Sequence, residues 1–126
     1  MFFIDADKTI HLTRGDTAAV VVSAQFEGGD AYSFAAGDIV RFSVFERKNA
    51  ANVYLSKDVQ AVEGEQAVSI ALTQEETKIG SIINKPTDLW YEVVLNPDTQ
   101  PQTIIGYDDG GEKILRLYPE GGVANG

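Results

Sequence analysis

The sequence has no cysteine and only one histidine in 126 residues. Without cysteine the chain cannot hold disulfides, thiolate-bound metals or a cysteine nucleophile, and one histidine excludes any site that needs two. Positive charge is also scarce, since 10 Lys and Arg stand against 19 Asp and Glu and leave a net charge of −9. Because contact with phosphate needs a basic face, we expect no nucleic acid and no membrane among its partners.

Long apolar runs are also lacking. The longest, Thr17 to Ala24, is far shorter than the ~20 residues of a membrane-spanning helix. The chain starts with only a few apolar residues before Asp5 and Asp7, whereas a secretory signal has a basic start and a longer apolar run. We therefore expect no signal peptide and no transmembrane segment, with synthesis in the cytoplasm of the cell that makes the chain.

The apolar residues that are present suffice for one core. Hydrophobic residues make up 44% of the chain and charged residues 23%, as is usual for a globular protein. A chain of this length buries roughly two-thirds of its unfolded surface, enough for one core and not for two. We predict a single domain over residues 1–119, followed by a flexible C-terminal tail over residues 120–126.

The dominant pattern is the alternation of apolar and polar residues that is typical of half-buried β-strands. The segments with this pattern are 9–12, 18–26, 39–45, 53–57, 67–72, 89–95, 103–107 and 113–118. Turn residues stand between them at 27–30, 36–38, 63–65, 96–98 and 108–111. This spacing predicts an all-β fold, an immunoglobulin-like antiparallel β-sandwich, with a closed barrel as the alternative.

One segment breaks the alternation. Thr73 and Glu76 have the spacing of a capping box, in which each side chain bonds the backbone N–H of the other, and Gly80 is a typical helix stop. Only about two helical turns fit between these signals. We therefore predict one short crossover helix that links two strands.

Few residues could carry chemistry. No base, nucleophile or orienting group accompanies His11 in the pattern, so we expect a surface or edge histidine. Asp5 with Asp7, and the acids within 108–112, do not follow the spacing of a calcium loop and suit turns. A carboxylate pair could serve a hydrolase only across a cleft and with a raised pKa. We predict no catalytic residue, no cofactor and no metal.

The most distinctive stretch joins two of the predicted strands. It consists of Leu12, Thr13, Arg14, Gly15 and Asp16. Its last three residues also form the integrin-type tripeptide. We favour a strand–turn–strand element, because Gly15 bends the chain and the side chain of Asp16 caps the turn.

In succession, the stretch 12–16, the turn Gly37–Asp38 and the helix start Thr73–Glu76 resemble small β-sandwich proteins of tailed phages and prophages. The resemblance covers Ile10 to about Leu95 and is to the N-terminal domain of upper baseplate proteins and to related tail or head-fibre proteins. It implies a non-enzymatic structural or assembly protein of the virion, in which the motif residues are structural. Its expected partners are other virion proteins, with a homo-oligomer as a further option.

A carbohydrate-binding module that contacts host-surface glycans is the alternative. Trp90 is its candidate contact residue, because an exposed indole can stack on a sugar, and nearby tyrosines could extend the surface. Alternation puts Trp90 and Tyr91 on opposite faces of one strand. Much of the acidic charge stands in turns and near the chain ends, so we expect a negative rim that favours a partner with a basic docking face.

Overall fold

Extended strands dominate the computed structural model, which describes residues 1–26, 28–46, 51–108 and 110–120. The strands are β1 (Phe2–Ile4), β2 (Ile10–Thr13), β3 (Ala18–Val22), β4 (Ile39–Phe45), β5 (Val53–Gln60), β6 (Val68–Leu72), β7 (Thr87–Leu95), β8 (Gln102–Ile105) and β9 (Lys113–Tyr118). The described residues form one helix, α1 (Gln74–Thr77). The predicted all-β fold with one short crossover helix is confirmed, and β1 is a strand that the alternation did not predict.

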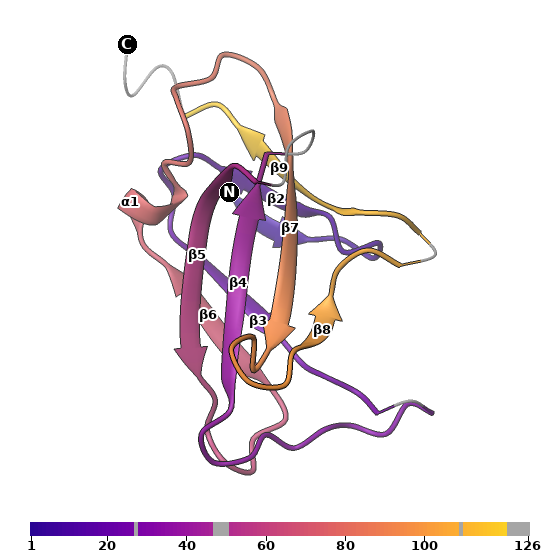
Figure 1. Ribbon diagram of the computed structural model, residues 1–126. Coiled ribbons are helices and arrows are strands. Elements are labelled where there is room, and N and C mark those ends of the chain that lie inside the picture. The colour runs from indigo at the N-terminus through magenta and orange to yellow at the C-terminus, as the bar shows by residue number, and fades with distance from the viewer. Residues whose placement is uncertain (27, 47–50, 109, 121–126) are drawn as a thin grey trace.

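The strands form two sheets that lie in separate layers (Figure 1). The larger sheet has seven strands in the order β1-β2-β9-β7-β4-β5, with β8 also paired to β7, and the smaller sheet is β3-β6. Among the described strands β1 and β5 have one partner each, so the large sheet stays open and does not close into a barrel. All pairs are antiparallel except β2 and β9, which are parallel. A parallel pair needs a long connection, and most of the chain lies between these two strands.

The alternation directs one side of each strand into the core between the sheets. The fully buried side chains include Ile10, Leu12, Val20, Phe42, Val44, Ile70, Tyr91, Val93, Leu115 and Leu117. Phe26, predicted to share a face with Val20, is instead 58% exposed. β3 ends at Val22, and Phe26 follows in a turn where Gln25 bridges Ala31, so the strand period no longer applies there.

The helix α1 begins at the predicted capping box. The Thr73 hydroxyl accepts a hydrogen bond from the Glu76 N–H at 3.2 Å, and the Glu76 carboxylate accepts one from the Thr73 N–H at 2.9 Å. The helix has only 4 residues, fewer than predicted, because Lys78 already leaves the helical conformation. Across the described ranges, no helix has the length and apolar character needed to cross a membrane.

Replacing Thr73 by alanine is expected to lower the free energy of unfolding by about 1 kcal/mol, because a helix N–H then loses its acceptor. Urea unfolding followed by the emission of the single tryptophan measures the change. Thr99→Ala is the matched control, since Thr99 is exposed in the turn after β7. Equal losses in the two variants would contradict a capping role for Thr73.

Candidate functional site

The stretch 12–16 forms the β2–β3 turn and packs against α1. Leu12 is a core residue, and Gly15 has the positive φ of 90° that a side chain would strain. The buried hydroxyl of Thr77 accepts a hydrogen bond from the Gly15 N–H at 3.0 Å and donates one to the Asp16 carbonyl at 2.7 Å. The structure therefore brings together two of the motif stretches through Thr77, the residue that directly follows the helix start Thr73–Glu76.

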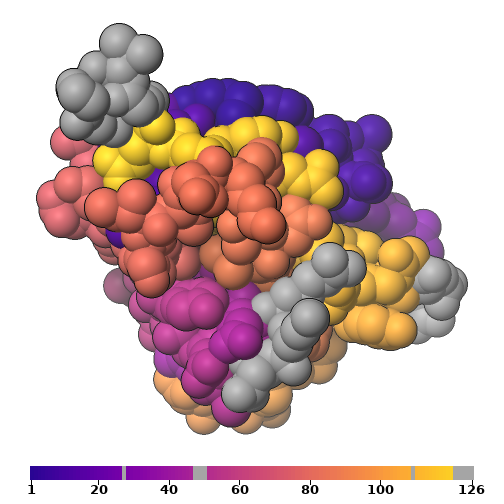
Figure 2. Space-filling model, turned by 90° about the horizontal axis from the view of Figure 1, so that it is seen from above, coloured from indigo at the N-terminus to yellow at the C-terminus, as the bar shows by residue number. Residues whose placement is uncertain are grey.

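Arg14 extends this connection to the loop after α1. Its guanidinium donates to the carbonyls of Ile79 at 3.2 Å and Gly80 at 2.9 Å, and it forms an ion pair with Glu120. The side chain is only 9% exposed, so Arg14 is not presented as part of an adhesion tripeptide. Figure 2 shows this end of the molecule, where the loop after α1, β9 and the first strands pack together. Glu120 is the first residue of the predicted tail, and residues 121–126 lie outside the described residues.

The turn Gly37–Asp38 lies at the other end of the sandwich (Figure 1). The buried Asp38 carboxylate accepts hydrogen bonds from the Asn96 amide at 3.0 Å, the Tyr32 hydroxyl at 2.6 Å and the Ala35 N–H at 2.9 Å. These bonds hold the pKa of Asp38 below its usual value, and the bond from Asn96 has the largest effect. The same contact with Asp38 raises the pKa of Tyr32. The two groups therefore form a carboxylate–phenol pair within the β3–β4 loop, and the bond from Asn96 links this loop to the end of β7.

Lys57 is a further structural residue that the sequence analysis missed. It lies on the edge strand β5, and its ammonium donates to the Ala71 carbonyl of β6 and to the Glu76 carboxylate at 2.9 Å. The bond between the Lys57 ammonium and the Glu76 carboxylate is the main reason that the pKa of Glu76 is lowered. Alternation from Leu55, which pairs with the buried Val44, places Lys57 on the inner side of β5, whereas Val53 lies beyond a β-bulge. An inward lysine on an edge strand also hinders pairing with another chain.

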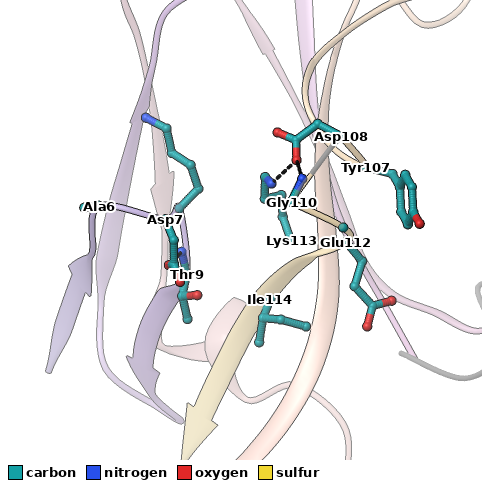
Figure 3. Close-up of a pocket in the computed structure, with 11 residues that line it drawn as sticks. Ala6, Asp7, Thr9, Tyr107, Asp108, Gly110, Glu112, Lys113 and Ile114 are labelled. Atoms are coloured by element: carbon teal, nitrogen blue, oxygen red, sulfur yellow. Dashed lines mark hydrogen bonds and ion pairs between the residues drawn. The ribbon is translucent and has the colours of Figure 1, made fainter.

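A polar cleft of about 860 Å³ lies between the β1–β2 turn and the β8–β9 loop (Figure 3). Its buried cation, Lys113, donates to Asp108 at 2.7 Å, and this bond lowers the pKa of Asp108. Across the cleft, a hydrogen bond with Asp5 is the main cause that lowers the pKa of Asp7 to about 2. General-acid chemistry needs a carboxyl with a raised pKa, whereas the pKa values of Asp7 and Asp108 are both lowered. The described residues contain no group of three or more potential metal ligands.

His11 lies on β2, and its partner in the neighbouring strand β1 of the same sheet is Phe3. The His11 Nε2 is 2.8 Å from the Asp5 carboxylate, its Nδ1 is 2.8 Å from the Tyr118 hydroxyl, and its ring stacks on Phe3 at 4.2 Å. The residue is 8% exposed, so the expectation of a surface or edge histidine was wrong. The reason is that β1 pairs with β2 as an additional strand at the end of the sheet, so β2 is not the edge strand. Both ring nitrogens have partners within the fold, which makes His11 a link between β1 and β9.

Trp90 lies on the outer face of β7, opposite the buried Tyr91, as alternation predicted. The indole is half-buried, and its ring centroid lies 5.7 Å from that of Phe45 on β4. The indole Nε1 is buried, and among the described residues it has no hydrogen-bond partner. This part of the sheet therefore presents an aromatic surface without an accessible indole N–H to bond a ligand.

The motif residues thus brace the two ends of the sandwich, and the open surfaces of the described residues include the polar cleft and the outer face of the large sheet. Neither surface assembles a nucleophile, base and orienting group from the described residues. Comparison of the chain with models of protein families, with curated proteins and with solved structures finds no match.

Proposed function

We propose that this chain is a non-enzymatic structural or assembly component of a phage virion, in the baseplate, tail or head fibre, and that it acts through protein–protein contacts. The succession of motifs that resembles small phage β-sandwich proteins suggests the class. The observation that carries the proposal is that the motif residues spend their side-chain bonds on contacts within the fold. Arg14, Asp38 and Glu76 are all bonded within the fold, as expected for residues whose role is structural.

The surface of the sandwich supports contact with other proteins. Large apolar side chains stand exposed on an otherwise acidic molecule, and they include Val21, Phe26, Val53, Tyr54, Val62, Ile82 and Tyr107. Exposed apolar side chains of this size are a usual component of protein interfaces. The strand β1 also ends the large sheet, and edge strands are natural docking elements.

Association with particles tests the proposal. Particles produced by the phage or lysogen that carries this gene are purified on a density gradient and probed with an antibody against the chain. We expect the chain in the particle fraction after a high-salt wash, with an unrelated cytosolic protein absent from it. A chain found only in the soluble fraction would overturn the proposal. Light scattering over a concentration series measures separately whether the chain forms a homo-oligomer.

A carbohydrate-binding module is the second candidate, and the position of Trp90 beside Phe45 on an open sheet face favours it. Because Trp90 is the single tryptophan, its emission reports directly on this face. Titration with soluble cell-wall oligosaccharides would give a saturable change in emission if the module binds glycans. Such a change, lost on Phe45→Ala but kept in Phe26→Ala, would replace the virion proposal.

A further inference from the structure

A row of apolar side chains crosses the outer face of the large sheet at right angles to its strands. The strand register places Val53 of β5 beside Phe45 of β4, Phe45 beside Trp90 of β7, and Trp90 beside Ile114 of β9. Phe45, Trp90 and Ile114 are half-buried, and Val53 is 50% exposed. These four residues, called the outer row below, therefore form a continuous apolar surface over adjacent strands. The order of the strands β5, β4, β7 and β9 can be followed in Figure 1.

Glu92 lies beside the outer row. It follows Trp90 by two residues on β7, so its side chain is on the same face, with its Cα roughly 7 Å along the strand. The side chain is half-buried. In the part of the chain that the structure describes, its carboxylate has no hydrogen-bond or ion-pair partner. A negative charge thus stands unmatched at the border of an apolar surface.

Other carboxylates on the outer face of the large sheet are paired with arginines. Asp58 on β5 accepts from Arg41 at 2.7 Å, and Asp88 on β7 accepts from Arg116 at 2.7 Å. These pairs show how this face accommodates carboxylates between its strands. Glu92 differs from them because no arginine among the described residues pairs with it, and a partner could supply one.

We propose that the outer row and Glu92 form a docking site for a basic segment of another protein, in which an Arg or Lys side chain lies over Trp90 and Phe45 and pairs with Glu92. The methylene groups of such a side chain pack on apolar surface while its head stays polar. A guanidinium over an indole gains a cation–π contact, and its pairing with a carboxylate is a strong, charge-assisted bond. The inference rests on the proposed function and names the chemistry of its partner.

Charge complementarity favours a basic protein segment over a second copy of the chain, a neutral glycan or an anionic membrane. A second copy of the chain would bring another net charge of −9 and a second unmatched Glu92 to the interface. A neutral glycan would leave the charge of Glu92 unpaired, and an anionic membrane would be repelled by it. A basic protein segment satisfies both the apolar row and the carboxylate.

Two synthetic peptides test the proposal, Thr-Val-Arg-Val-Arg-Val-Thr and the same sequence with Glu in place of each Arg. Each carries a fluorescein label, and its anisotropy is measured as the full chain is added. We expect saturable binding of the Arg peptide with a change in Trp90 emission, and no binding of the Glu peptide. Glu92→Gln is expected to weaken binding of the Arg peptide about fivefold, as loss of a partly exposed ion pair does.

Glu75→Gln is the matched control, because it removes the same charge from an exposed position on α1. Val53→Ser, an exposed substitution that leaves the core intact, should also weaken binding. Equal effects of Glu92→Gln and Glu75→Gln would overturn the proposal, since net charge alone would then explain binding. A shift of Trp90 emission by a neutral N-acetylglucosamine tetramer, without binding of the Arg peptide, would assign the face to glycans instead.

The two proposals can fail separately. If the Arg peptide does not bind, the docking site is overturned even where the chain purifies with particles. If the wild-type chain is absent from particles, the proposed function is overturned whatever the peptide does.

Discussion

Replacing Arg14 by alanine is expected to lower the free energy of unfolding by about 3 kcal/mol, because a buried carbonyl and a carboxylate then lose a charged donor. The buried carbonyl is that of Ile79, whereas the carbonyl of the exposed Gly80 can bond water instead. Arg14→Lys should restore only part of the loss, since an ammonium group lacks the planar fork that reaches several acceptors at once. Urea unfolding measures both variants.

Arg116→Ala is the control for this prediction. Arg116 also binds a carboxylate, that of Asp88, but its side chain is 41% exposed against 9% for Arg14, so its loss should cost less. A local measurement adds a second check. Amide exchange at Gly15, whose N–H donates to Thr77, should become faster in Arg14→Ala and stay unchanged in Arg116→Ala. Similar behaviour of the two variants would contradict the role of Arg14 as the link between the β2–β3 turn and the loop after α1.

Replacing Asp38 by asparagine is expected to lower the free energy of unfolding by about 2 kcal/mol near neutral pH, because three hydrogen bonds lose a charged acceptor. The change also has a defined pH dependence. Because the bonds from Asn96 and Tyr32 hold the pKa of Asp38 below its ordinary value of 3.8, the unfolded chain takes up this proton first as the pH falls. The stability that Asp38 confers is therefore complete above that value and is lost as the pH falls through the lowered pKa.

The difference between the wild type and Asp38→Asn isolates this effect, because other lowered carboxyls, such as that of Asp58, contribute equally to both proteins. We expect the two stability curves to converge in acid. At alkaline pH Tyr32 makes stability depend on pH in the opposite direction. Because its pKa is raised in the folded chain, the stability that Tyr32 confers is present below the ordinary pKa of 10 and is lost as the pH rises above it. Asp30→Asn, at an exposed loop position, is the control. Parallel curves for wild type and Asp38→Asn at all pH values would contradict the assignment.

Local features of the molecule could be predicted from the sequence. The capping box at Thr73 and Glu76 joins residues three apart, and the strand alternation joins residues two apart, so both are visible as short-range patterns. The prediction failed at Phe26 because a strand ended earlier than its apolar pattern. It also failed at His11 because a strand of only 3 residues, β1, is too short to show a period.

The sequence by itself determined the class of the fold, the start of the helix, the turns and the opposite directions of Trp90 and Tyr91. Only the tertiary structure decided which distant groups meet: Arg14 with the carbonyls after α1, Asp38 with Asn96, and Lys57 with β6. It also decided that Glu92 stands without a partner beside the outer row, within the described residues. The physical reason is that periodicity and capping depend on neighbours along the chain, whereas these bonds depend on strand order and sheet packing, which local pattern does not specify.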